Sequence, residues 1–230
     1  MAMATVLVTG ANRGIGLALT RAFQGRGDHV IATCRHSSPE LEGLLDRPGI
    51  EVVDGVDVTS DAATAALPGR IGLDRRIDVL VLNAGILRDD GGRIGPELDL
   101  AQVAEQLAVN AIAPLRVIRD LTLHLQAGSK IALITSRMGS IADNTSGGYY
   151  GYRMSKAALN AMGMSLARDL QARRIAVALL HPGFVRTAMV GYAGNVSAAD
   201  SAQMLLARID ALTLETSGSF WHANGERLPW

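Results

Sequence analysis

Short apolar runs recur along the chain, separated by longer segments in which apolar residues have helical spacing. The runs are rich in Val, Ile and Leu and occupy Thr5–Thr9, His29–Thr33, Glu51–Val53, Val79–Leu82, Lys130–Thr135 and Ile175–Leu180, with a weaker run at Gly218–His222. Strands that are apolar on both faces are typical of a parallel sheet covered on each side, because the crossover between parallel strands needs a helix to return the chain. The pattern therefore predicts a doubly wound α/β fold, with a parallel sheet of about seven strands and helices on both faces.

Two segments, Asp99–Gln126 and Tyr152–Ala172, are the longest helical candidates. Gly128 is expected to stop the first helix, because glycine readily adopts the left-handed backbone that ends helices. Pro114 predicts a kink within it. The chain has no low-complexity linker and no repeat of solenoid period, so we expect residues 1–230 to form one domain.

Charge and composition narrow the class of partner. The 22 basic and 22 acidic side chains cancel, and no long run of like charge offers a surface for nucleic acid or anionic lipid. No apolar stretch approaches the roughly 20 residues that cross a bilayer, and the first ten residues lack the features of a signal peptide. The single cysteine, Cys34, has no partner for a disulfide or a metal-ligand pair, so no metal site is expected. These features predict a cytoplasmic protein whose partners are small molecules and other copies of itself.

A glycine-rich turn, Gly10-Ala11-Asn12-Arg13-Gly14-Ile15-Gly16, follows the first predicted strand, and helical spacing begins directly after it. Such a turn lets backbone N–H groups and the positive end of a helix approach a pyrophosphate without a Cβ atom in the way. Its G-x-x-x-G-x-G spacing departs from the G-x-G-x-x-G pattern of many dehydrogenases. The turn predicts a dinucleotide site, and the alternative is a tight turn without a ligand.

Tyr152 and Lys156 stand four residues apart, so on a helix they share a face. An ordinary tyrosine has a pKa of about 10, and lowering it to near 7 requires about 4 kcal/mol. A cation about 4 Å away, at an effective dielectric constant near 20, contributes a similar amount. The pair therefore predicts a phenol that is acidic enough to exchange a proton with a substrate.

With this pair, the chain resembles the short-chain dehydrogenase/reductase family over nearly its whole length. Four motifs occur in the family's order: the glycine-rich turn, Asn83-Ala84-Gly85, Asn110, and the set Ser136, Tyr152 and Lys156. The resemblance implies that Tyr152 is the general acid for carbonyl reduction and that Lys156 also holds the nicotinamide ribose. It implies that Ser136 hydrogen-bonds the reacting oxygen and that Asn110 anchors a water leading protons to Lys156. These roles suit the chemistry, because hydride delivered to a carbonyl carbon leaves an oxygen that needs a proton and hydrogen-bond donors.

The position of the catalytic serine stays open at this point. Ser136 stands further ahead of Tyr152 than is usual in the family, which indicates an insertion in the loop Ser140–Gly148 and keeps Ser140 as a second candidate. Tyr149 and Tyr150 have no lysine four residues later, so we expect them to line the pocket or to pack. His181 is expected to pack.

The resemblance also implies the residues that bind the cofactor. They are Gly10, Asn12, Arg13, Gly14, Ile15, Gly16, Arg35, Asp57, Val58, Asn83, Ala84, Gly85, Tyr152, Lys156, Pro182, Gly183, Val185 and Thr187. NAD-specific members carry an acidic residue where this chain has Cys34, and Arg35 follows it. Because guanidinium groups bind phosphate through two hydrogen bonds, Arg13 and Arg35 can grip a 2′-phosphate, and we predict NADPH over NADH.

The expected substrate lid, residues 188–199, is short. With the final segment Asn224–Trp230, it resembles the subgroup of C-factor-like proteins and sniffer-type carbonyl reductases. This resemblance implies NADPH-dependent reduction of an aldehyde, ketone or quinone to an alcohol. The alternative is an NADP(H)-binding regulatory or signalling protein of the C-factor type with little or no turnover. Family members commonly pair through the two long helices, so a homodimer or homotetramer is expected.

Overall fold

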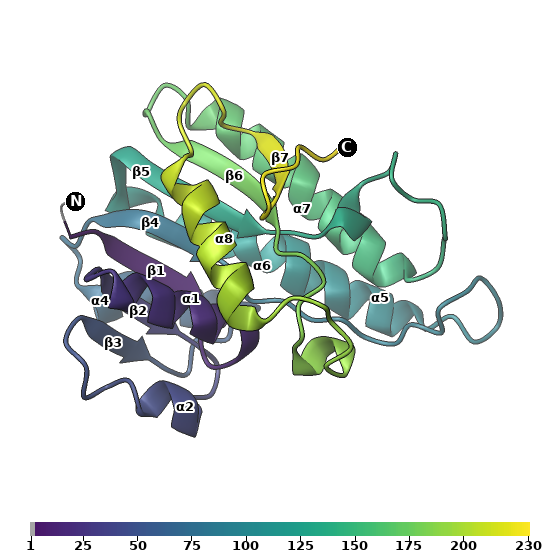
Figure 1. The fold of residues 1–230 in the computed structure, drawn as a ribbon, viewed down its shortest axis with the longest axis horizontal. Coiled ribbons are helices and arrows are strands. Elements are labelled where there is room, and N and C mark those ends of the chain that lie inside the picture. Colours follow the sequence, from purple (N-terminus) through teal and green to yellow (C-terminus); the bar gives the residue numbers. More distant parts are fainter. Residues whose placement is uncertain (1–2) are drawn as a thin grey trace.

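The central sheet is parallel throughout, and its strands lie in the order β3-β2-β1-β4-β5-β6-β7 (Figure 1). The computed structural model describes residues 3–230. The strands are β1 (Thr5–Thr9), β2 (His29–Thr33), β3 (Ile50–Val53), β4 (Ile77–Leu82), β5 (Leu125–Ile134), β6 (Ala176–His181) and β7 (Ser219–His222). The doubly wound fold and its seventh strand are confirmed.

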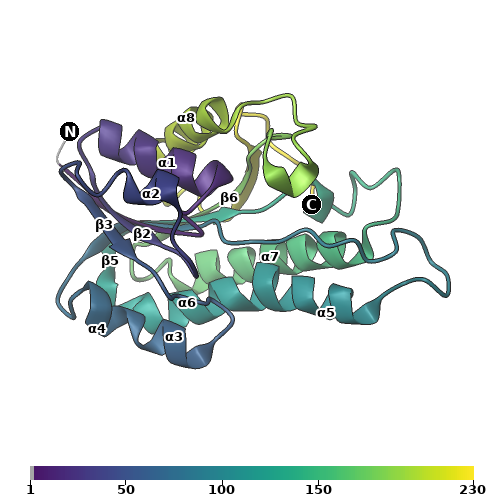
Figure 2. The same cartoon turned by 90° about the horizontal axis from the view of Figure 1, so that it is seen from below.

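Helices cover both faces of the sheet (Figure 2). On one face lie α1 (Gly14–Gly25), α2 (Pro39–Glu42) and α8 (Ala198–Asp210), and on the other lie α3 (Asp61–Ala65), α4 (Leu67–Ile71), α5 (Leu100–Leu107), α6 (Ala113–Leu121) and α7 (Tyr150–Asp169). Each face has its own hydrophobic core. Along β1, for example, Val6 and Val8 belong to the core under α1, whereas Leu7 belongs to the opposite one. Burial on both faces explains why the strands are apolar without alternation.

The strand order reverses between β1 and β4, and in open α/β sheets ligands bind at such a reversal, in the crevice outside the carboxyl ends of the strands. The motifs identified in the sequence follow β1, β4, β5 and β6, so they converge at this edge. Within residues 3–230, no helix has the length and apolar content that crossing a membrane requires.

The expected helix Asp99–Gln126 is confirmed as far as Leu121 and is wrong at its end. α5 passes through a π-helical turn, η1 (Ala108–Ile112), into α6, and a 3₁₀ turn, η2 (Thr122–His124), leads directly into β5. Leu125 is buried and pairs with Ile77 of β4, so burial in the sheet outweighs the helical spacing of this segment. Pro114 lies in the first turn of α6, directly after the π-helical turn that interrupts the regular α-helix, and at this position its missing N–H costs little.

Candidate active site

Close contacts at the glycine-rich turn exclude larger residues. Gly10 has a φ of 66°, and an added Cβ would lie 2.9 Å from Ala84 Cα. A Cβ on Gly16 would overlap the Gly10 carbonyl oxygen. Arg13, which precedes α1, makes no side-chain hydrogen bond to the helix. The positive end of α1 is therefore available to an anion.

Asn83 ties this turn to the end of β4. Its Nδ2 donates to the Thr9 and Gly10 carbonyl oxygens at 3.0 and 3.2 Å. In return, Thr9 Oγ1 accepts hydrogen bonds from the main-chain N–H groups of Asn83 and Ala84 at 3.0 and 3.1 Å. These bonds hold β1 and β4 together at the reversal of strand order.

Tyr152 and Lys156 lie on one face of α7, as their spacing predicts. Lys156 Nζ lies 5.8 Å from the centroid of the Tyr152 ring and donates to the Ile134 carbonyl oxygen at 3.0 Å. Lys156 is only 5% exposed, and burial lowers the pKa of its ammonium to about 8. The lysine side chain thus reaches from α7 to the end of β5, where its ammonium is held.

The pKa of Tyr152 does not move in the direction expected from the sequence. Loss of water around the phenol raises its pKa above the ordinary value, and the nearby Ser136 hydroxyl opposes this rise without cancelling it. The physical reason is that removing a phenolate from water costs more than one hydroxyl contact returns. The phenol is consequently protonated at neutral pH, which is the form that a proton donor needs.

The two candidate serines have different surroundings. Ser136 lies close enough to Tyr152 for its hydroxyl to lower the pKa of the phenol, and its Oγ accepts from Met138 N at 3.2 Å at the start of the 3₁₀ turn η3 (Arg137–Gly139). Ser140 Oγ instead donates to the Trp230 main-chain oxygen at 3.2 Å and accepts from Asp143 N at 3.1 Å. The structure brings Ser136 to the tyrosine and assigns Ser140 to packing of the C-terminal segment.

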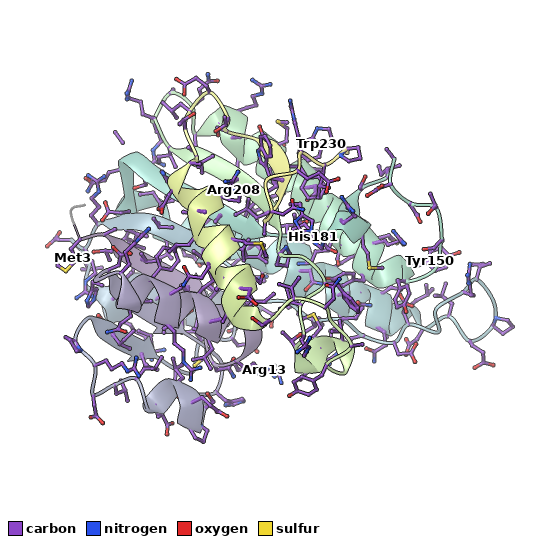
Figure 3. The ribbon with its side chains drawn as sticks, viewed as in Figure 1. Met3, Arg13, Tyr150, His181, Arg208 and Trp230 are labelled. Atoms are coloured by element: carbon purple, nitrogen blue, oxygen red, sulfur yellow. The ribbon has the colours of Figure 1, made fainter. Side chains whose placement is uncertain are left out.

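The segment Asn224–Trp230 is fastened to the loop that follows Ser136. Arg137 Nη2 lies 2.6 Å from Glu226 Oε1, and Ala142 N donates to the Trp230 main-chain oxygen at 2.8 Å. The Trp230 ring stacks on Phe220 of β7 with 5.6 Å between centroids, and Figure 3 shows this tryptophan beside that strand. The final segment Asn224–Trp230 therefore supports the loop that follows Ser136.

Asn110 is fully buried in η1, and its amide bonds to protein groups. Its Oδ1 accepts from Ile86 N at 2.8 Å, and its Nδ2 donates to Ile86 O at 2.8 Å and to Ser155 Oγ at 3.0 Å. These contacts use both N–H donors, so the side chain holds the chain after Gly85 in place. A role in binding a water through Asn110 stays a prediction.

Gln106 was missed in the sequence. It is fully buried one turn before Asn110, and its Oε1 accepts from Arg88 N at 3.1 Å. Two amide side chains four residues apart in a helix with apolar neighbours were the available signal, because buried amides need specific partners.

On the cofactor side, Arg13 and Arg35 are exposed, and neither forms an ion pair with a carboxylate among residues 3–230. Asn12 Nδ2 donates to the His36 carbonyl oxygen at 2.9 Å, which joins the glycine-rich turn to the chain after β2. Arg13 and Arg35 thus stand on two linked loops, with their charges available to a ligand.

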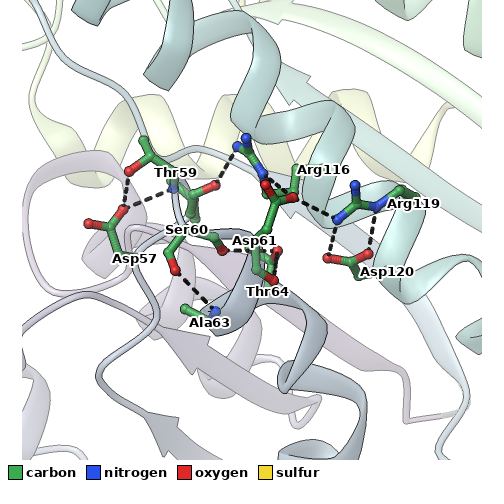
Figure 4. A network of polar contacts seen from close by, with 10 residues as sticks. Asp57, Thr59, Ser60, Asp61, Ala63, Thr64, Arg116, Arg119 and Asp120 are labelled. Atoms are coloured by element: carbon green, nitrogen blue, oxygen red, sulfur yellow. Dashed lines mark hydrogen bonds and ion pairs between the residues drawn. The ribbon is translucent and has the colours of Figure 1, made fainter.

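Asp57 and Val58 follow β3, and Figure 4 shows Asp57 bonded by Thr59 and the nearby Asp61 bonded by Arg116 of α6. Arg116 Nη1 donates to the Val58 carbonyl oxygen at 3.2 Å, while its Nε donates to Asp61 Oδ1 at 2.9 Å. Thr59 donates two hydrogen bonds to Asp57 Oδ1, and these bonds lower the pKa of the Asp57 carboxyl. The segment is fixed with an ionised carboxylate at its start.

The chain after β6 crosses over the glycine-rich turn. A Cβ added to Gly14 would lie 3.4 Å from Thr187 Cγ2, and Figure 3 shows Arg13 beside the short helix η4 (Ala188–Val190). Val185 forms a parallel bridge to Val196, and Ser201 Oγ of α8 donates to Pro182 O at 2.8 Å. Pro182, Gly183, Val185 and Thr187 are therefore at the same crevice as the turn.

His181 packs at the end of β6. Its ring contacts His222 edge to face, with 4.8 Å between centroids. Burial, with smaller effects of His222 and Arg137, lowers the pKa of His181 to about 3. The imidazole is therefore neutral at physiological pH, which disfavours it as a proton donor.

Comparison with known proteins agrees with this geometry. Residues 4–196 match the family model described as short chain dehydrogenase. The 1-hydroxy-2-glutathionyl-2-methyl-3-butene dehydrogenase of Rhodococcus sp. (strain AD45) is 39% identical over 99% of this chain and 100% of its own length. The carbonyl reductase Sniffer of D. melanogaster superposes with a TM-score of 0.92 at 30% identity, over 99% of this chain and 100% of that one. A carbonyl reductase of Pseudomonas aeruginosa PAO1, solved in complex with NADP, superposes with a TM-score of 0.83 at 36% identity and full coverage of both chains.

The fold, the order of the motifs and these similarities point to one family of oxidoreductases. Its model spans the residues from β1 into the lid, and the relatives are covered over their whole length. The chain belongs to the short-chain dehydrogenase/reductase family and is similar to its sniffer-type carbonyl reductases.

Proposed function

We propose that the protein is an NADPH-dependent oxidoreductase that reduces an aldehyde, ketone or quinone to an alcohol, with Tyr152 as the general acid. The observation that carries the proposal is the contact of the protonated Tyr152 phenol with Ser136, above the buried ammonium of Lys156. This set lies at the carboxyl ends of the strands, where ligands bind in open α/β sheets.

The residues around the crevice fit the cofactor. Gly10 and Gly16 leave no space for a Cβ, so the backbone itself faces the ligand at the start of α1. Arg13 and Arg35 offer two guanidinium groups to a 2′-phosphate, and NADP bound to the similar Pseudomonas aeruginosa reductase supports this choice. The remaining contacts would come from Asp57 and Val58, from Asn83-Ala84-Gly85, and from the chain between Pro182 and Thr187. When bound, NADPH supplies the hydride.

In the proposed reaction, the substrate carbonyl oxygen accepts hydrogen bonds from the hydroxyl groups of Ser136 and Tyr152. As the carbonyl carbon gains a hydride, its π-electron pair moves to the oxygen, which takes the phenol proton. Lys156, whose pKa is about 8, carries positive charge at neutral pH and stabilises the phenolate that forms. Asn110 and Gln106 keep the neighbouring loop fixed through their bonds to Ile86 and Arg88.

The short lid at residues 188–199 gives the substrate few specifying contacts, which favours a broad carbonyl specificity. The Rhodococcus relative is named as a dehydrogenase, which is the reverse of the same chemistry. In that direction Tyr152 of this chain would act as a base. In this proposal, residues 1–230 act as one cofactor-binding domain. Copies pair through the helices α5, α6 and α7 into a dimer or tetramer.

The test is NADPH oxidation with aromatic aldehydes, diketones and quinones. Tyr152→Phe is expected to lower kcat by about 10²–10⁴-fold, because the proton donor is lost. NADPH affinity, measured by fluorescence titration, should change by about twofold or less, since the phenol ring stays in place. Turnover that survives the substitution would refute the assignment. Absence of turnover across the panel, together with micromolar NADPH binding, would favour the regulatory alternative.

A further inference from the structure

Asp90 is a buried carboxyl group that the proposed chemistry does not use. It lies in the loop between β4 and α5 and is only 1% exposed. Its Oδ2 accepts a hydrogen bond from Gly151 N of α7 at 2.7 Å, and its Oδ1 accepts one from Gly92 N at 3.1 Å. Burying such a group costs free energy unless it is hydrogen-bonded, so these two bonds explain how the site tolerates it.

Helix α7 lacks a cap of its own. Tyr149, the residue before the helix, has a left-handed backbone with a φ of 52° and makes no side-chain cap. The first N–H groups of a helix have no partner within it, and an acidic group near them is favourable because they lie at the positive end of the helix dipole. Asp90 supplies that partner from a different segment of the chain.

A second contact holds the same turn. Tyr149 N donates to the Gly92 carbonyl oxygen at 3.1 Å, so residues 90 and 92 grip the start of α7 at two points. Gly148, just ahead of the helix, passes so close to Gly92 that an added Cβ would lie 2.6 Å from its carbonyl oxygen. Residues 90–92 are therefore tied to the first turn of α7.

The first turn of α7 also lies tightly against α5. A Cβ on Gly151 would lie 2.9 Å from Val103 Cα and would overlap Gln106 Nε2. Gln106 and Asn110 in turn hold the main chain of Arg88 and Ile86. Three alternate residues of this loop are thus hydrogen-bonded to three helical elements: Ile86 to η1, Arg88 to α5 and Asp90 to α7. We call residues 86–92 the strap.

We infer that Asp90 is a positioning residue that sets the place of Tyr152 by capping α7 through the strap. Tyr152 follows Gly151 directly, so the amide that Asp90 holds is one residue from the reacting phenol. A misplacement of about 1 Å can cost about 100-fold in rate, which makes this anchor matter for turnover. The inference rests on the proposed function wherever turnover is the measurement.

Asp90→Asn tests the anchor with little change in shape. The main-chain N–H groups of Gly151 and Gly92 both donate to the Asp90 carboxylate, but the asparagine amide has only one oxygen to accept them. One of the two hydrogen bonds is therefore lost. We expect kcat to fall about tenfold or more, whereas the dissociation constant of NADPH changes by about twofold or less. The isotope effect on kcat with 4-deuterated NADPH should rise, because the chemical step becomes slower than product release. The matched control is Asp89→Asn: Asp89 Oδ1 accepts from Gly91 N at 3.1 Å in the same loop, is exposed, and does not bond α7.

A second measurement does not depend on turnover. In Asp90→Asn, hydrogen exchange at the Gly151 amide should accelerate about tenfold or more, with amides at the end of α7 unchanged. Gly151→Ala should lower kcat in the same way, and combined with Asp90→Asn it should cost less than the product of the two single effects. A folded Asp90→Asn protein with the kcat and Gly151 exchange of the Asp89→Asn control would overturn the inference. If the wild type turns over no carbonyl, the proposed function fails while the exchange measurement still decides the role of Asp90.

Discussion

The ammonium nitrogen of Lys156 lies 5.8 Å from the centre of the Tyr152 ring, and its hydrogen bond goes to Ile134 O at 3.0 Å. Helix α7 therefore places the lysine near the phenol ring, and the Ile134 carbonyl at the end of β5 fixes the lysine ammonium. Lys156 is buried and Tyr152 is half-buried, and loss of water around them lowers the pKa of the lysine and raises that of the tyrosine. Both shifts disfavour the charged form of the group, as desolvation does.

Lys156 should make stability depend on pH in a defined direction. Between pH 8 and 10.5 the unfolded chain binds a proton at this lysine that the folded protein has released, so stability rises with pH across this range. The full effect corresponds to about 3 kcal/mol. Urea unfolding of the wild type and Lys156→Met at pH 7, 8, 9 and 10 measures it. As pH rises, the free energy of unfolding of the wild type should increase relative to that of Lys156→Met. An equal pH dependence of the two proteins would contradict the lowered pKa.

Arg13 and Arg35 should decide between the two nicotinamide cofactors. Each substitution to alanine is expected to weaken NADPH binding about tenfold, since a charged hydrogen bond to phosphate contributes about 1.5–3 kcal/mol. NADH affinity should stay within about twofold, because NADH has no 2′-phosphate for these groups to bind. Fluorescence titration with both cofactors makes the measurement. Arg47→Ala is the control, an exposed arginine elsewhere on the surface, and equal losses for NADPH and NADH would contradict the assignment.

Substitution of Ser136 should affect activity, whereas substitution of Ser140 should affect stability. Ser136→Ala is expected to lower kcat about 10²-fold with little change in the free energy of unfolding, because it removes a donor to the reacting oxygen. Ser140→Ala should keep the turnover rate and lower stability by about 1 kcal/mol, since its hydroxyl bonds Trp230 and Asp143. Steady-state kinetics and urea unfolding of both variants provide the comparison. The reverse result would return the catalytic role to Ser140.

Two glycines of α1 should respond to alanine with opposite signs. Gly16→Ala places a methyl group against the Gly10 carbonyl and Asn83 Nδ2, and it is expected to destabilise the fold by about 1–3 kcal/mol and to abolish cofactor binding. Gly25→Ala meets nothing within 4 Å and should stabilise by up to about 1 kcal/mol, because alanine loses less backbone entropy in a helix. Thermal unfolding and NADPH titration test both, and the idea fails if Gly16→Ala is tolerated.

Local sequence patterns were sufficient to predict the architecture of the sheet. The apolar runs predicted every strand of the sheet except the first half of β5, because a strand buried on both faces must be apolar whatever its neighbours are. The i,i+4 spacing was also sufficient for Tyr152 and Lys156, since four residues always lie on one helical face. These features depend on nearby residues alone.

Contacts between distant residues decided the rest. Leu125 joins β5 because Ile77 lies beside it, and Ser140 leaves the site because Trp230, 90 residues later, accepts its hydrogen bond. Asp90 meets Gly151 across 61 residues, and the pKa of Tyr152 rises because several segments together exclude water. Periodicity and spacing establish which segments form and which faces they bury, whereas partners, burial and charge exist only once the chain has folded.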